Sequence, residues 1–313
     1  MLALRSFFLS CVAFAAAVVA TQAAVLVPVP AAPNSTSTTA FGINDANKIS
    51  GSYVGAGDGI EHAFFGTLDG KYTSFDAGEG GSEARAINNG GYIVGYSNSQ
   101  HGFTSDTPIF ERLPNGKLLT VAGLFGRAQG IDNAKNRFAG TRWDAANHQA
   151  VAFKGVHGKY RKDVRIPQVH QASEANGINS DGLVVGDYFR PPMHGFIGSG
   201  NKMQIVDYPS DKASGTLLEG INDVGQAVGQ WVDENGNAHS FLLDIATNTF
   251  TDINVNGASN VYAWNINNAG AVALSSNAGS FVWCKKKSAC PAGGTAVAAP
   301  EHAGKFGPRL HWH

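Results

Sequence analysis

Four histidines recur in the same sequence setting, and histidine is a common metal ligand. His62, His101, His194 and His239 each lie two residues before a phenylalanine. If the copies belong to separate structural units, the imidazoles lie too far apart to share one ion, because ligand distances are near ~2 Å. A role repeated once per unit fits better, so we expect each ring to make a fixed hydrogen bond that orients a strand end. The sequence therefore predicts no metal and no cofactor.

A second candidate for chemistry is a segment that faintly resembles a calcium-binding loop. Residues 233–244 place acidic or amide side chains at the first, third, fifth and twelfth positions. Ala238, however, occupies the position where such a loop requires glycine. Asn235-Gly236 between two β-rich runs is typical of a tight hairpin turn, so we favour the hairpin.

Local catalytic motifs are absent from the sequence. There is no Gly-x-Ser-x-Gly, no His-Glu-x-x-His and no glycine-rich phosphate loop before a helix. An active site assembled from separate loops needs no such motif, so this absence weakens an enzymatic interpretation without excluding it. The sequence assigns no catalytic residue.

The side chains best suited to bind a ligand lie at variable positions inside repetitive strands. Each copy has an isoleucine before a turn, and the residues one and three before it are small in most copies, which suits a crowded innermost strand. The residues two and four before it vary, and a sugar could stack on their aromatic rings. Alternatively, they vary because they face solvent or a water-filled channel. The candidate ligand-binding residues are Phe41, Glu83, Arg85, Arg127, Glu174, Glu219, Tyr262 and Trp264.

These positions are defined by an internal repeat. An asparagine or aspartate follows each isoleucine, and a glycine or asparagine comes three or four residues later, a type that tolerates positive φ. Each copy holds about four short β-rich runs, and no helical period of useful length appears beyond the first two dozen residues. The repeated isoleucines are Ile43, Ile87, Ile131, Ile178, Ile221 and Ile266.

The two ends of the repeat array complement one another. The sixth copy lacks a fourth strand, whereas residues 25–30 form a β-rich run with no preceding repeat. Pairing this run with the sixth copy would leave no open sheet edge. The sequence predicts an all-β fold, a six-bladed β-propeller with four antiparallel strands per blade, closed by the N-terminal strand pairing into the last blade. A linear solenoid is the alternative, but it would need distinct polar caps.

The repeat resembles a known group of sequences. The pattern Gly-Ile-Asn-Asp-x-Gly-x-x-x-Gly runs from Gly220 to Gly229, and triplets such as His62-Ala-Phe64 recur along the chain. Both are similar to the probable extracellular HAF repeat family, named after its His-Ala-Phe signature, over about residues 25–284. The resemblance implies a secreted bacterial protein with a propeller-like fold, and it supplies no established activity. The third and sixth copies depart from the pattern, since they lack the histidine.

The ends of the chain differ in composition from the repeats. Residues 1–23 contain an apolar run and a small-residue cleavage site, typical of a signal peptide, and the run is shorter than the ~20 residues that span a membrane. Residues 24–284 are expected to form the propeller, and residues 285–313 a low-complexity, disordered tail. Without the signal peptide two cysteines remain, and we expect Cys284 and Cys290 to form a disulfide.

The charge of the chain limits its partners. Lys and Arg number 23 against 24 Asp and Glu, and charged residues make up 15% of the sequence. Such a chain has no strong field to attract nucleic acid or an anionic membrane, and no other segment could span a bilayer. We expect a monomer that is secreted to the extracellular space or the periplasm.

These observations predict a non-enzymatic protein that binds a ligand or partner, a carbohydrate or an extracellular protein, at one mouth of the ring. The first alternative is a secreted propeller hydrolase or lyase that uses acidic and basic residues near the channel. The second is a purely structural surface or matrix protein.

Overall fold

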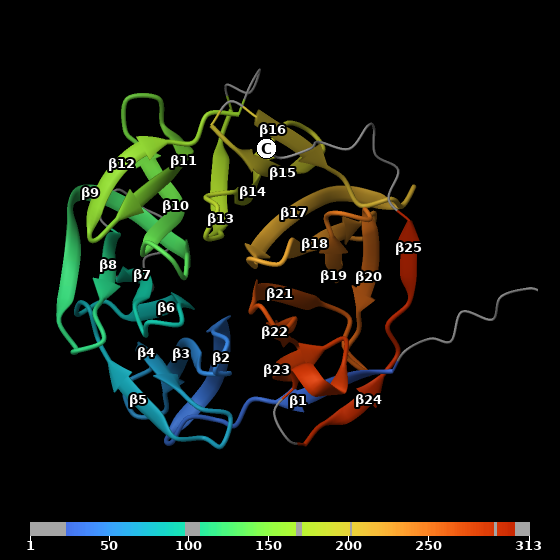
Figure 1. Cartoon of the computed structure of the whole chain (residues 1–313). Helices are drawn as coiled ribbons and strands as arrows, with labels where there is room; N and C mark the ends of the chain where they lie inside the picture. The colour runs from blue at the N-terminus through green and yellow to red at the C-terminus, as the bar shows by residue number, and fades with distance from the viewer. Residues whose placement is uncertain (1–22, 98–106, 167–170, 201, 291–292, 304–313) are drawn as a thin grey trace, which may run out of the picture.

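A computed structural model describes residues 23–97, 107–166, 171–200, 202–290 and 293–303. Within these ranges the regular secondary structure is β-strand, joined by turns and loops, apart from a short 3-10 turn, η2 (Lys287–Ala289). The all-β prediction is confirmed. Figure 1 shows the strands arranged in sheets around a common centre. The predicted signal peptide lies outside the described residues except for its last position.

The strands form four hydrogen-bonded sheets. The first contains β2 (Ser35–Ile43), β3 (Ile49–Gly55), β4 (Glu61–Gly66) and β5 (Tyr72–Phe75). The second contains β6 (Ser82–Ile87), β7 (Ile93–Ser97), β8 (Pro108–Arg112), β9 (Leu118–Ile131), β10 (Arg137–Asp144), β11 (Gln149–Val156) and β12 (Lys159–Asp163). It joins the second and third repeats because the long strand β9 pairs with β8 at its beginning and with β10 at its end.

The third sheet likewise joins two repeats. It contains β13 (Ser173–Ile178), β14 (Val184–Phe189), β15 (Met193–Ser199), β16 (Lys202–Val206), β17 (Ala213–Ile221), β18 (Gln226–Asp233), β19 (Ala238–Asp244), β20 (Thr249–Ile253) and β25 (Glu301–Ala303). The fourth contains β21 (Val261–Ile266), β22 (Ala271–Ser276), β23 (Gly279–Cys284), β1 (Ala24–Pro28) and β24 (Thr295–Val297). Within each repeat the neighbouring strands are antiparallel.

The predicted turn after the innermost strand is present in all six repeats. The position predicted to need positive φ has φ between 51° and 84°, in the left-handed region where glycine and asparagine are the favoured residues. These residues are Asn47, Gly91, Asn136, Gly182, Gly225 and Gly270.

The asparagine at the start of this turn has a second role, which is to join neighbouring repeats. The amide of Asn44 donates to the carbonyl of Asn88 (3.1 Å), one repeat further along the chain. Equivalent bonds run from Asn88 to Asp132, from Asn179 to Asn222, from Asn222 to Asn267 and from Asn267 back to Asn44. The bonds therefore connect the last repeat to the first.

The third repeat breaks this pattern because aspartate has no amide to donate. Arg137 takes over the role. Its Nε bonds to the buried carboxylate of Asp132, and its Nη2 donates to the carbonyl of Asn179 (3.2 Å). The substitution of aspartate for asparagine is thus compensated within the same repeat, and the cycle of hydrogen bonds is complete.

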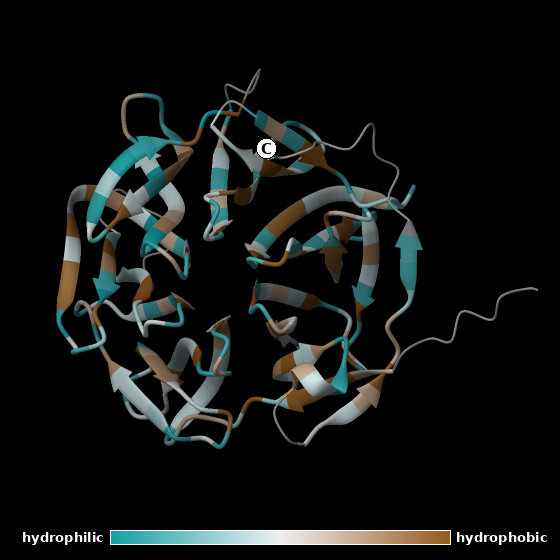
Figure 2. Ribbon diagram, in the orientation of Figure 1, coloured by the Kyte–Doolittle hydropathy of each residue, from teal (hydrophilic) through white to brown (hydrophobic). Residues whose placement is uncertain are grey.

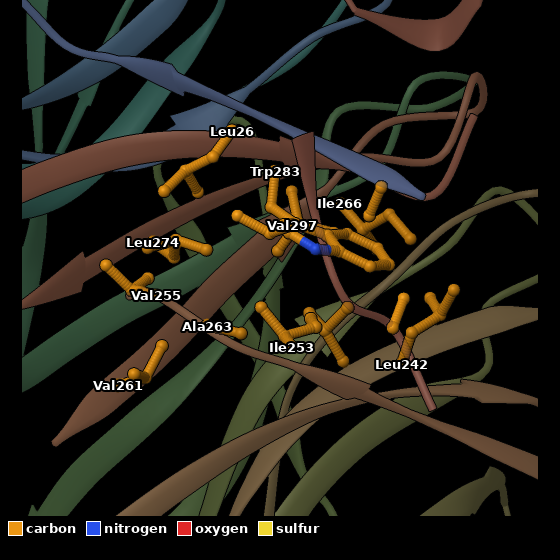
Figure 3. Close-up of a cluster of buried hydrophobic side chains, with 14 residues drawn as sticks. Leu26, Leu242, Ile253, Val255, Val261, Ala263, Ile266, Leu274, Trp283 and Val297 are labelled. Carbon is orange, nitrogen blue, oxygen red and sulfur yellow. The ribbon is translucent and has the colours of Figure 1, made fainter. Parts of the chain in front are cut away.

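Both ends of the chain take part in the fourth sheet. β1 pairs with β23 on one side and with β24 on the other. Figure 3 shows Leu26, Trp283 and Val297 from these three strands in one buried hydrophobic cluster. The predicted disulfide between Cys284 and Cys290 is confirmed.

Residues 285–313 were expected to form a disordered tail, and the described part of this segment contains η2 and two short strands, β24 and β25. β24 adds to the free edge of β1, and β25 adds to the edge of β20. Val297 and Ala299 are buried against the core, and this burial of apolar surface favours docking of the segment.

In Figure 2 the outer strands β12 and β25 carry mainly hydrophilic residues. No helix in the described ranges has the length and apolarity of a membrane span.

Candidate active site

The innermost strand of every repeat has a β-bulge at the same place, two residues before the isoleucine. A bulge leaves one residue outside the ladder and changes the direction of its side chain, and bulges are common beside active sites. The residues skipped by the register are Phe41, Arg85, Gln129, Asn176, Glu219 and Trp264. These are the variable positions that the sequence singled out.

The bulges bring side chains from five repeats to one pocket of about 250 Å³. Its charged members come from the innermost strands and from the strands beside them. A tyrosine, two amides and a tryptophan complete its polar and aromatic wall. The residues used below are Arg85, Tyr96, Arg127, Gln129, Glu174, Asn176, Asp187, Glu219 and Trp264.

Three carboxyl groups of the pocket have raised pKa values. Burial raises the pKa of Glu219 to about 7, although the positive charge of Arg85 opposes the shift. Burial raises the pKa of Asp187 well above its ordinary value, and the negative charges of Glu174 and Glu219 add to the effect. Burial also raises the pKa of Glu174 against the opposing charges of Arg127 and Arg85. The pocket can therefore hold a protonated acid and a base together near neutral pH.

Two amide side chains, linked by a hydrogen bond, hold Asp187 in place. The Nδ2 of Asn176 donates to Asp187 Oδ1 (2.9 Å) and to the carbonyl oxygen of Leu218 (3.0 Å) in the next repeat. Gln129 Nε2 donates to Asn176 Oδ1 (2.6 Å), which orients the asparagine. The acid is thus fixed by residues from the third, fourth and fifth repeats, as preorganised chemistry requires.

Arg85 is held between two aromatic rings. Its guanidinium lies 4.1 Å from the ring centre of Phe41 and 4.6 Å from that of Trp264, and Nη1 is 3.2 Å from Glu83 Oε2. Burial is the largest influence and disfavours its charge, but the negative charges of Glu83 and Glu219, the nearby Tyr96 and the hydrogen bond to Glu83 together outweigh burial and raise the pKa of Arg85. The arginine therefore provides a fixed positive charge at the pocket wall.

The eight residues predicted from the sequence lie together. Arg85, Arg127, Glu174, Glu219 and Trp264 line the pocket. Phe41 and Glu83 contact Arg85, and Tyr262 stacks on Trp264 with ring centres 5.8 Å apart. Sugar stacking on Trp264 stays a prediction.

Two polar pocket residues outside the innermost strands, Asp187 and Tyr96, were not predicted, and Gln129 and Asn176 occupy the variable position without having been among the eight. Asp187 and Tyr96 each follow a glycine inside the second strand of the repeat, and each pairs across the ladder with a predicted glutamate, Asp187 with Glu174 and Tyr96 with Glu83. The glycine before Asp187 is required there, because a Cβ at Gly186 would lie 1.9 Å from the carbonyl oxygen of Glu174. The residue after this glycine also varies between repeats, and that variation was the signal available in the sequence.

The recurrent histidines lie away from this pocket, and the hydrogen-bond prediction is confirmed for three of them. His62 bonds to Asp58 and Asp76, His194 to Asp207, and His239 to Asp233. Each ring also packs on the aromatic residue directly opposite on the second strand. His101 lies outside the described residues. Within the described ranges, no group of three or more His, Cys, Asp or Glu side chains is placed to hold a metal ion.

The calcium-like segment is the hairpin that the sequence favoured. Oδ1 of Asp233 accepts hydrogen bonds from the backbone N–H groups of Asn235 and Asn237, and Gly236 has φ of 82°. The carboxylate is thus engaged by its own turn.

The fold and the pocket define an all-β chain with a buried acid–base site. No family model and no curated protein matches its sequence. It is similar to the crystal structure of selenomethionine-substituted virginiamycin B lyase from Staphylococcus aureus, with 10% identity and a TM-score of 0.43, over 79% of this chain and 94% of that chain.

A non-enzymatic binding protein was expected, and this expectation is corrected because the pocket gathers buried carboxyl groups with raised pKa values, the kind of group that the enzymatic alternative requires. The similar structure is that of a lyase. The expectation gave too little weight to burial, which turns the glutamates of the variable positions from surface charges into groups with raised pKa values. At this degree of likeness no residue and no substrate is transferred, and the enzymatic interpretation depends on the pocket itself.

Proposed function

We infer that the chain is a six-bladed β-propeller in which each repeat is one blade and β1 completes the last blade. Three observations support this inference. The sheets surround a common centre in Figure 1, β1 pairs with β23, and the hydrogen bonds of the turn asparagines return from Asn267 to Asn44. The pocket then lies on the axis, where the innermost strands of the blades meet.

We propose that this pocket is the active site of a lyase that eliminates a leaving group next to a carboxylate or carbonyl. The observation that carries the proposal is the convergence of Glu174, Asp187 and Glu219 with Arg85 and Arg127 in one largely buried pocket. Elimination needs a base for a weakly acidic C–H, a positive charge beside the developing enolate, and an acid for the leaving group. The pocket contains all three kinds of group.

The pKa values divide the roles between the carboxyl groups. Glu219, with its pKa at about 7, is the base that takes the proton from carbon. The positive charges of Arg85 and Arg127 stabilise the enolate oxygen that forms. Asp187, whose pKa is raised further by its two acidic neighbours, is the acid. It gives its proton to the leaving oxygen as the carbon–oxygen bond breaks and a carbon–carbon double bond forms.

A carbohydrate substrate suits this chemistry. In a uronic acid the hydrogen on C5 lies next to a carboxylate, and the neighbouring C4 carries the glycosidic oxygen that would leave. The two arginines would hold the carboxylate, and the aromatic ring of Trp264 at the pocket wall, supported by Tyr262 stacked on it, would contact the sugar. We therefore propose an acidic polysaccharide as the substrate class.

We also propose secretion into an oxidising compartment and membership of the HAF repeat family. Support for the compartment comes from the disulfide between Cys284 and Cys290, a bond typical of extracellular and periplasmic proteins. Support for the family is the repeated turn asparagine, to which the structure gives a role between blades.

The test is a product assay with uronic-acid polysaccharides. The wild type should generate ultraviolet absorbance from the new double bond, with a rate that rises with pH as Glu219 ionises. Glu219→Gln should lower kcat by about 10²-fold or more, whereas Glu79→Gln, at an exposed residue outside the pocket, should leave it unchanged. A product without a double bond that carries ¹⁸O from labelled water would replace elimination with hydrolysis. Equal rates for wild type and Glu219→Gln would refute the assignment of the base.

A further inference from the structure

A second pocket, lined by none of the residues of the carboxyl pocket, lies at the outer strands of the third repeat. It has a volume of about 280 Å³. Lys154 of β11 and Tyr160 and Lys162 of β12 contribute to its wall, Arg165 follows β12, and Gly200 comes from the fourth repeat. The pocket therefore lies where two repeats meet.

The charge of this pocket is strongly positive. Its one acidic residue, Asp163, is engaged by Arg142 through two hydrogen bonds of 2.8 and 2.9 Å. Among the described residues, no carboxylate lies within ion-pair distance of Lys154, Lys162 or Arg165. Three cations thus share one concave surface, and within the described ranges none of them is paired with a carboxylate.

The positions of the two lysines cost the fold stability. Lys154 and Lys162 are direct partners across the β11–β12 ladder, and like charges in this arrangement destabilise a sheet. Burial, together with the positive charges of Lys162 and Arg137, lowers the pKa of Lys154 to about 8. The Nζ of Lys154 donates a hydrogen bond to the carbonyl oxygen of Gly182 (2.9 Å) in the next repeat.

We propose that this pocket binds a tetrahedral dianion, a phosphate or sulfate group. Such a group accepts several charge-assisted hydrogen bonds at once, which suits two ammonium groups and a guanidinium around one cavity. The partly exposed ring of Tyr160, whose hydroxyl interacts with Asp163, adds an apolar surface for whatever carries the anion. The site is independent of the proposed lyase activity, since none of its residues lines the carboxyl pocket.

Inorganic phosphate is the probe for the test. Binding to the wild type at low ionic strength, followed by NMR chemical shifts and calorimetry, should saturate. Lys162→Gln and Arg165→Gln should each weaken binding roughly fivefold or more. Lys159→Gln removes the same charge from an exposed lysine of the same strand that does not line the pocket, and it should change the affinity less than about twofold.

A second measurement reports on the buried lysine directly. The Nζ of Lys154 should titrate near pH 8 in the free protein and at higher pH with phosphate bound, because the anion stabilises the ammonium form. Failure of phosphate to saturate the wild type, or an equal loss of affinity in Lys159→Gln, would overturn the proposal. An unchanged titration of Lys154 would overturn it as well.

The source of the anion is decided by a third arm. A sulfated polysaccharide that binds more tightly per sulfate than inorganic sulfate, and loses this advantage in Lys162→Gln, would identify a polymer ligand. Binding of the inorganic ions alone, with the same dependence on Lys162, would identify a free ion.

Discussion

Replacing Glu219 by glutamine should make the protein more stable above neutral pH. Burial raises the pKa of this carboxyl from its ordinary 4.5 to about 7. The folded state therefore binds a proton more tightly than the unfolded state does. Stability falls as pH rises from 4.5 to 7, and the loss is complete above pH 7.

The size of the effect follows from the two pKa values. Between pH 5 and pH 8, ionisation of Glu219 should remove about 2–3 kcal/mol from the free energy of unfolding of the wild type. Glutamine has nearly the same shape and does not ionise, so Glu219→Gln should not show this loss. The variant should thus gain about 2–3 kcal/mol relative to the wild type over this interval. A gain in stability on removal of a catalytic group is the expected trade-off at an active site.

Denaturant unfolding at pH 5 and pH 8 measures this quantity. The double difference, between the two proteins and the two pH values, cancels every other group that titrates equally in both. Glu79→Gln is the control, because its side chain is exposed and outside the pocket, and its double difference should be within about 0.5 kcal/mol of zero. A Glu219→Gln variant with a double difference near zero, or one less stable at pH 8 than at pH 5 relative to wild type, would refute the reasoning.

Three further predictions concern the fold. Arg137→Ala should lower the free energy of unfolding by about 3 kcal/mol, because it leaves the carboxylate of Asp132 buried without a cation. Adding Asp132→Asn should recover most of this loss by restoring an amide donor. Thermal melts of the wild type and the two variants test the prediction, and no recovery in the double variant would contradict the compensating role of Arg137. Deletion of residues 25–31 should expose an edge of β23 and lower the melting temperature or cause aggregation, and an unchanged melt would argue against closure of the last blade by β1. Replacing Cys284 and Cys290 by serine should cost about 2 kcal/mol in unfolding by denaturant, and equal stability would show that the bond adds nothing.

The repeat array could be predicted because its signals are local. The turn position that needs positive φ is occupied by glycine or asparagine in every repeat. Asn47 and Gly225, one of each type, both have φ in the left-handed region. The asparagine before the turn was predicted only as a turn residue. Its bond to the next repeat could not be inferred from one copy, since it depends on how two copies pack.

The site could be predicted in part, for the same reason. Arg85 and Glu219 occupy a position whose residue type differs from repeat to repeat while its neighbours recur. That contrast identified the position from the sequence. Asp187 was missed because its place beside Glu174 is set by the ladder register, which the bulge shifts. The three-residue strand β24 was missed because its sequence alone has no strand signal; it forms because β1 offers an edge.

The pairing of the first strand with strands near the end of the chain has a consequence for how the molecule folds. Val25 lies opposite Cys284 in the ladder, about 260 positions apart. A chain made from its N-terminus must hold β1 without a partner until nearly all of it has been synthesised. Closing so long a loop costs entropy that only the completed sheet repays, so the last repeat should be the last to form and the first to open. A circular permutant that joins Ala303 to Ala24 through a short linker and begins within a turn between two other repeats would bring β1 and β23 much closer in sequence, and should fold faster without a change in its fold.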